Sequence, residues 1–110
     1  MRTRTGAMLA ALVVAAQAAP AAQPAISGKA VFEKWCAPCH APGPGHPGTI
    51  ALAALYKGAK PAALAERTDL TPEIVKHYVR TGVSVMPFFR KTEVSDAELA
   101  SLADYLAHKP

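Results

Sequence analysis

The residues whose types and spacing fit a specific chemistry are Cys36, Cys39 and His40, within the run Cys-Ala-Pro-Cys-His. Two thiols at this spacing can each add to a vinyl group of a haem, and a histidine directly after the second thiol can ligate the iron. The same cysteines, preceded by Trp35, also fit the redox-active turn of a thioredoxin-like protein, which cycles between dithiol and disulfide. The chain has only two cysteines, so the motif predicts one of these two redox chemistries.

The sequence around the motif favours the haem over the dithiol and over zinc. A thioredoxin-like motif follows a central strand, yet only about ten residues separate an Ala/Pro-rich segment from Cys36, and no later β-branched runs could build a sheet. A zinc site would need four ligands, and His46, His77 and His108 offer no clear second pair. We therefore expect one covalently bound haem c.

If a haem is bound, the methionines indicate its second axial ligand. Met1 and Met8 lie at the extreme N-terminus, which leaves Met86 alone in the rest of the chain. Met86 precedes Pro87 in an irregular segment that can bring a thioether over the iron. We predict His40 and Met86 as the two axial ligands. The alternative is a haem enzyme or gas sensor whose sixth position is open or easily vacated.

The N-terminus has the features of a secretory signal. Arg2 and Arg4 give it a basic start, residues 6–19 are almost wholly apolar, and residues 16–18 fit a small-x-small cleavage site. The apolar run is shorter than the roughly 20 residues that cross a bilayer as a helix. We predict a signal peptide over 1–18, a flexible Ala/Pro-rich segment over 19–24 and one folded domain over 25–110. The expected location is the periplasm, with no stable membrane span after cleavage.

The charge balance gives no indication of a nucleic-acid partner. The whole chain carries a formal net charge of +4, and two of its basic residues belong to the predicted signal. The local clusters Lys57/Lys60 and Arg90/Lys91 are interpreted as solvated surface charge.

Capping signals and apolar periodicity predict short helices and no strand. A helix should begin after Ser27 and run into the cysteine motif, and the Gly/Pro alternation over 41–48 should form a loop. A short helix around Leu52 should stop at Gly58, and Pro61 should open a turn through residue 66.

The second half of the chain gives clearer helix signals. Thr71 should cap a helix that ends at Gly82, with a buried side formed by residues 74, 75, 78 and 79. Ser95 and Glu98 form a capping box ahead of a last helix that reaches Leu106.

These features together resemble a small class I c-type cytochrome over about residues 28–106. Gly28 and Phe32 precede Cys36 by eight and four residues, Tyr105 lies in the last helix, and the segment around Met86 resembles the family's methionine loop. The resemblance implies an all-α cytochrome c fold with four to five short helices around one covalent haem. It also implies that the first and last helices cross at right angles, with Gly28 permitting close approach.

The resemblance also implies roles for residues beside the motif. A proline carbonyl should accept the second ring N–H of His40; Pro42, Pro44 and Pro47 compete for this role, and we expect Pro47. Trp35 should cover the haem edge or the core.

The expected function is one-electron transfer without catalysis. The chain looks like cytochrome subunits that accept electrons from periplasmic dehydrogenases, including flavin enzymes that oxidise 4-alkylphenols. Its expected partners are therefore such a dehydrogenase and a downstream electron acceptor.

Overall fold

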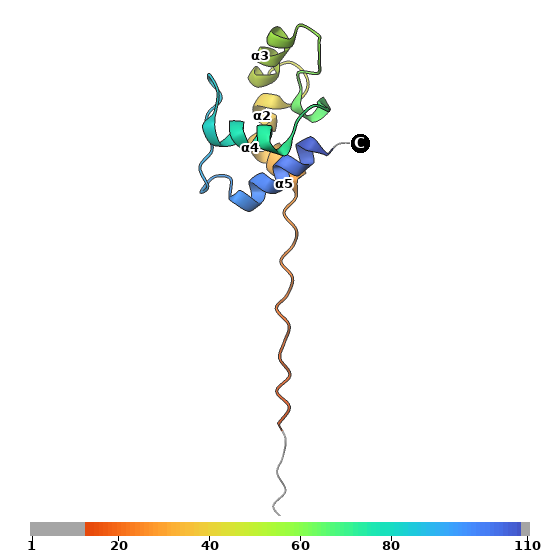
Figure 1. Cartoon of the computed structure of the whole chain (residues 1–110), viewed down its shortest axis with the longest axis vertical. Coiled ribbons are helices and arrows are strands. Elements are labelled where there is room, and N and C mark those ends of the chain that lie inside the picture. The colour runs from red at the N-terminus through yellow and green to blue at the C-terminus, as the bar shows by residue number, and fades with distance from the viewer. Residues whose placement is uncertain (1–12, 109–110) are drawn as a thin grey trace, which may run out of the picture.

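The computed structural model describes residues 13–108. Residues 13–27 are exposed, have no regular secondary structure and lead away from the helical domain (Figure 1). The signal residues Met1, Arg2, Arg4 and Met8 lie outside the described part of the chain. Within residues 13–108, no helix combines the length and apolarity that a membrane crossing requires.

The described chain folds into five α-helices and one 3₁₀ helix, so the all-α prediction is confirmed. No strand forms between residues 13 and 108, where one isolated antiparallel bridge joins Val83 to Met86. The elements, in chain order, are α1 (Gly28–Trp35), α2 (Ala37–His40), α3 (Pro47–Tyr56), η1 (Leu64–Glu66), α4 (Pro72–Thr81) and α5 (Asp96–Ala107).

The close contact between α1 and α5 depends on Gly28. Ser27 caps α1 by accepting a hydrogen bond from the Ala30 amide at 3.3 Å. A Cβ on Gly28 would overlap the carbonyl oxygen of Ser101 and lie 2.7 Å from the Cβ of Tyr105. One turn further along, the rings of Phe32 and Tyr105 lie 5.9 Å apart. The close approach that the resemblance implied at Gly28 is therefore present.

The core is built mainly by α1, α4 and α5. Ser95 and Glu98 make the predicted capping box at the start of α5, and Thr71 caps α4. The buried hydrophobic residues of the cluster are Val31, Phe32, Leu70, Val75, Val79, Val94, Leu99, Leu102, Ala103 and Leu106.

Two predicted boundaries in the middle of the chain are wrong. The loop predicted over 41–48 ends at His46, because Pro47 occupies the first position of α3, where its missing N–H removes no helical hydrogen bond. The turn predicted from Pro61 is limited to η1 over Leu64–Glu66. The helix predicted to stop at Gly58 ends as expected, with Lys57 in the left-handed conformation (φ 49°).

The predicted buried side of α4 needs a correction as well. Val75 and Val79 are buried, whereas Ile74 and Tyr78 remain 41% and 43% exposed. All four line the same large cavity. A helical apolar pattern does not distinguish a residue that faces the core from one that faces a cavity.

The side chain of Arg80 holds the segment that follows α4 against this helix. Its Nη1 donates to the carbonyls of Phe89 and Val94 at 3.0 and 2.9 Å, and its Nη2 donates to Asp96 at 2.9 Å. The Phe89 amide also donates to the Val79 carbonyl at 2.8 Å. These bonds hold both ends of the loop that contains Met86.

Candidate functional site

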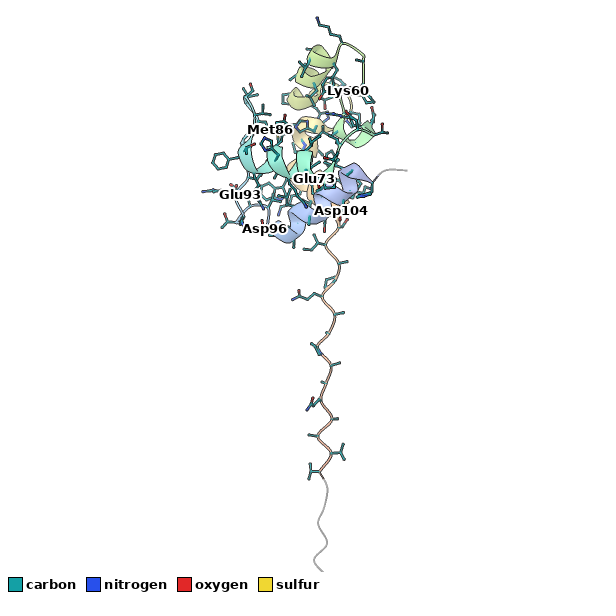
Figure 2. The ribbon with its side chains drawn as sticks, in the orientation of Figure 1. Lys60, Glu73, Met86, Glu93, Asp96 and Asp104 are labelled. Atoms are coloured by element: carbon teal, nitrogen blue, oxygen red, sulfur yellow. The ribbon has the colours of Figure 1, made fainter. Side chains whose placement is uncertain are left out.

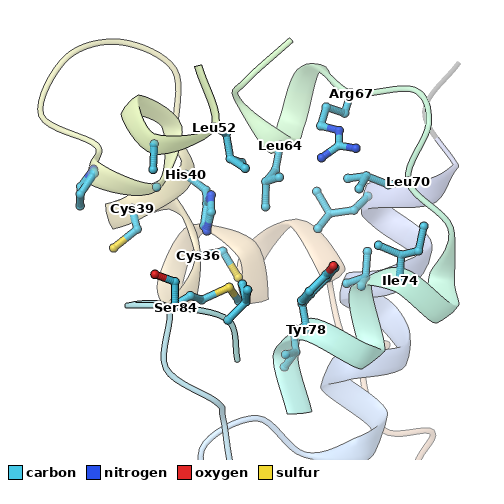
Figure 3. A pocket seen from close by; sticks show the side chains of 18 of the residues that line it. Cys36, Cys39, His40, Leu52, Leu64, Arg67, Leu70, Ile74, Tyr78 and Ser84 are labelled. Atoms are coloured by element: carbon cyan, nitrogen blue, oxygen red, sulfur yellow. The ribbon is translucent and has the colours of Figure 1, made fainter. Parts of the chain in front are cut away.

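A cavity of about 790 Å³ lies between α2, α3, η1, α4 and the Met86 loop (Figure 3). Its lining is mostly apolar, and its volume is in the range of cofactor sites, roughly 300–1,000 Å³. The structure brings all six predicted site residues into this lining: Trp35, Cys36, Cys39, His40, Pro47 and Met86. Residues separated by about 50 positions in the sequence thus share one site.

Cys36 lies at the junction between α1 and α2, and Cys39 lies within α2. Cys36 is half-buried, and Cys39 is exposed. Burial, with a smaller contribution from Cys39, raises the pKa of Cys36 to about 11. A redox-active dithiol needs a stabilised thiolate with a lowered pKa, and its fold needs a central sheet. The site therefore does not fit the thioredoxin-like alternative.

His40 ends α2 with its ring against the first turn of α3. Burial lowers the pKa of His40, which favours the neutral imidazole that ligates metals. The Nδ1 atom is buried and has no hydrogen-bond partner among the described residues. A Cβ added to Gly48 would lie 2.6 Å from Cε1 of this ring and 2.7 Å from the Cys39 carbonyl oxygen. The absence of a side chain at Gly48 therefore leaves the space that the imidazole occupies.

The loop between α2 and α3 is held by two further contacts. His46 Nδ1 lies 3.1 Å from the Pro38 carbonyl oxygen, and the Thr49 hydroxyl donates to the Ala41 carbonyl at 2.8 Å. His46 therefore helps to hold the conformation of this loop.

Gly48→Ala is expected to displace the His40 ring. The new methyl group would meet the backbone oxygen of Cys39, which cannot rotate away, and the ring of His40, which would have to shift, so we expect a loss of about 1–3 kcal/mol in the free energy of unfolding. The haem-loaded protein should also show an altered Soret spectrum. Thermal unfolding and absorption spectra of the purified holoprotein measure both effects. A change of Thr49, the next residue, to Ser keeps the hydroxyl and is the control; equal behaviour of the two variants would contradict the prediction.

Met86 is placed by a tight turn of the backbone. Val83 and Met86 exchange amide-to-carbonyl hydrogen bonds of 3.1 and 2.9 Å, and Ser84 between them has φ 53°. Gly82 has φ 66°, and a Cβ there would come within 2.6 Å of the Met86 carbonyl oxygen. The half-buried Met86 side chain lines the cavity beside α4 (Figure 2). The backbone conformation of this loop therefore places the thioether of Met86 in the cavity.

Trp35 closes the cavity beside the cysteines. Its ring packs edge-on against Phe89, with centroids 5.8 Å apart, and Lys34 Nζ lies 4.8 Å from its centroid. Its Nε1 atom is buried without a hydrogen-bond partner among the described residues.

The sequence did not single out two residues of this site, Gly48 and Arg67. Gly48 was assigned to a loop, and Arg67 lies in a charged stretch typical of surface. Arg67 is 9% exposed and lines the cavity. A buried arginine depends on distant contacts, so no local signal would have identified it. Residues 13–108 contain no cluster of three or more His, Cys, Asp or Glu side chains that could hold a metal ion.

Comparison with known proteins identifies the family. Residues 23–106 match the family model described as cytochrome c oxidase, cbb3-type, subunit III. The chain belongs to this cytochrome c family. The chain is also similar to a chain in a crystal structure of p-cresol methylhydroxylase with substrate bound, at 32% identity and a TM-score of 0.53. That match covers 76% of this chain and 93% of the other, and no curated protein matches.

As a member of this cytochrome c family, the protein is a haem-based electron carrier, and haem c is its cofactor. The site fits this group, because two thiols, a buried imidazole nitrogen and a thioether all line one large apolar cavity. Its role in the family is electron transfer, as part of an oxidoreductase system.

Proposed function

We propose that this protein is a periplasmic one-electron carrier in which Cys36 and Cys39 hold haem c covalently and His40 and Met86 are its axial ligands. When bound, haem c supplies an iron centre that gains and loses one electron. The observation that carries the proposal is that these four side chains line a single cavity. The turn that begins at Gly82 places Met86 in this cavity. This position favours Met86 as the sixth ligand of the iron over the open sixth position of a haem enzyme or sensor.

The protein's contribution is to bind, orient and exclude water. The apolar lining and the neutral thioether of Met86 disfavour extra positive charge at the metal, so the midpoint potential should be relatively high. Pro47 lines the cavity together with His40, but the expected hydrogen bond from the His40 ring to the Pro47 carbonyl is not formed, because Nδ1 has no partner among residues 13–108.

A dehydrogenase is the electron donor that the comparisons support, because the solved relative belongs to p-cresol methylhydroxylase. We propose such a partner, a dehydrogenase that uses a flavin, and a separate downstream acceptor. Val85 lines the cavity and is 94% exposed, and Phe88, on the same loop, is 60% exposed, so the Met86 loop offers an apolar surface where a partner could approach. Export by the sequence over 1–18 would bring the protein to the periplasm.

Met86→Ala tests the axial ligand. We expect the ferric holoprotein to lose its methionine-to-iron charge-transfer band and its midpoint potential to fall, because water or another donor replaces the thioether. Absorption spectra and a redox titration measure both. Thr92→Ala, at an exposed residue outside the cavity lining, should leave both unchanged. A wild-type spectrum without the band, together with an unchanged potential in the Met86 variant, would remove Met86 as the ligand.

A further inference from the structure

The side chain of Arg80 connects three segments of the fold at the end of α4. It is 23% exposed, and its two terminal nitrogens donate to Phe89, Val94 and Asp96 at 3.0, 2.9 and 2.9 Å. The acceptors at Phe89 and Val94 are backbone carbonyls, and Asp96 is the first residue of α5. Hydrogen bonds from a charged donor are stronger than those between neutral groups, and a buried carbonyl that loses its donor keeps the cost of its desolvation. Arg80 therefore ties α4 to the segment after Met86 and to α5.

Phe89 is the point where this segment is attached to α4, three residues after Met86. Its amide donates to the Val79 carbonyl at 2.8 Å, and its carbonyl accepts from Arg80. The loop is attached at its other end by the Gly82 amide, which donates at 2.8 Å to the carbonyl four residues earlier in α4. Between these two points every residue except Met86 is exposed, and the bridge inside the loop shapes it without attaching it to a helix. The position of Met86 therefore depends on how firmly Gly82 and Phe89 are held.

We propose that Arg80 is a positioning residue for the sixth ligand of the haem iron. By holding Phe89, it keeps the loop in the conformation that presents the Met86 thioether to the cavity. Arg80 itself does not line the cavity, so it acts through the loop and not by contact with haem c. The inference rests on the proposed function, in which Met86 is an axial ligand. Without Arg80, Met86 should leave the iron more often, and an added ligand should compete with it more successfully.

The test is an absorption titration of the ferric holoprotein with imidazole. Imidazole can bind at the sixth position only when the iron–sulfur bond to Met86 is broken, so its apparent affinity reports the fraction of protein in which that bond is open. We expect Arg80→Met to raise this affinity about tenfold, the equivalent of about 1.4 kcal/mol. Arg90→Met is the matched control, because the Arg90 side chain is 69% exposed and pairs with Glu93 at the surface. The control should change the affinity by less than about twofold.

The same titration in a Met86→Ala background separates positioning of Met86 from a general loosening of the fold. With the thioether gone, the sixth position is open, so Arg80→Met should change the imidazole affinity by less than about twofold. An equal increase in both backgrounds would show a role unrelated to Met86 and would overturn the inference. If Met86→Ala binds imidazole more tightly than the wild type but Arg80→Met does not, the inference alone fails. If Met86→Ala itself binds imidazole as the wild type does, Met86 is not the axial ligand and the proposed function fails first.

A conservative variant keeps the inference testable if Arg80→Met yields no holoprotein. Arg80→Lys retains the positive charge, but its single nitrogen cannot occupy the positions of both Nη1 and Nη2, so at least one of the three hydrogen bonds is lost. We expect the imidazole affinity of Arg80→Lys to rise by about twofold or more, and to show no such rise in the Met86→Ala background. An affinity equal to that of the wild type would overturn the inference.

Discussion

Replacing both Cys36 and Cys39 with serine is expected to abolish covalent haem attachment. Serine keeps the size of each side chain but cannot form the carbon–sulfur bond to a vinyl group. The variant made with a haem-attachment system should show no haem stain after denaturing electrophoresis, and its mass should be that of the polypeptide alone. The wild-type chain should carry the mass of one haem.

The same variant should also be much less stable than the wild-type holoprotein. A cavity of about 790 Å³ lined by apolar side chains is unfavourable when water fills it, and a small domain has little other core to compensate. Circular dichroism should show lost helix. Replacing Lys29 and Glu33, an exposed pair on α1, with serine is the control and should retain haem and helix. Haem stain in the double cysteine variant, or a wild-type chain that carries a disulfide in place of haem, would contradict the covalent site.

The helices could be predicted from the sequence because their boundaries depend on local chemistry. Ser27, Thr71 and Ser95 each accept a hydrogen bond from the backbone amide three residues later, as their sequence contexts indicated. The role predicted for Gly28 could also be inferred from its spacing to Cys36. The requirement is steric, because α5 leaves no room for a side chain at this residue.

The features that the sequence did not reveal depend on contacts between distant segments. Arg67 is buried and donates a hydrogen bond to Tyr56, eleven positions earlier. Ile74 and Tyr78 share the apolar spacing of Val75 and Val79, yet only the latter two are buried in the core. The start of α3 could not be predicted because proline occurs both in loops and at the first position of helices. Pro47 belongs to the same Gly/Pro-rich run as Pro42 and Pro44, but it begins a helix.

Gly28→Ala should destabilise the domain more than any other single methyl group added to it. The added Cβ would overlap the Ser101 carbonyl oxygen and lie 2.6 Å from the carbonyl carbon, and both atoms belong to the backbone of α5. Overpacking of this kind costs about 1–3 kcal/mol and occasionally more. The better helix propensity of alanine offsets at most about 1 kcal/mol. We therefore expect a net loss near the upper end, with a fall in melting temperature on the order of 10 °C.

The decisive comparison for Gly28→Ala is with Lys29→Ala on the next residue of α1. Lys29 is exposed and pairs weakly with Glu33 at 3.6 Å, so its loss should change the free energy of unfolding by less than about 0.5 kcal/mol. Thermal and denaturant unfolding of the holoproteins measure both. Separation of α1 from α5 would also move the Phe32–Tyr105 contact, now 5.9 Å between ring centres, which near-ultraviolet circular dichroism detects. If Gly28→Ala unfolds at the same temperature and denaturant concentration as the wild type, the packing of α1 on α5 does not depend on close approach at this residue.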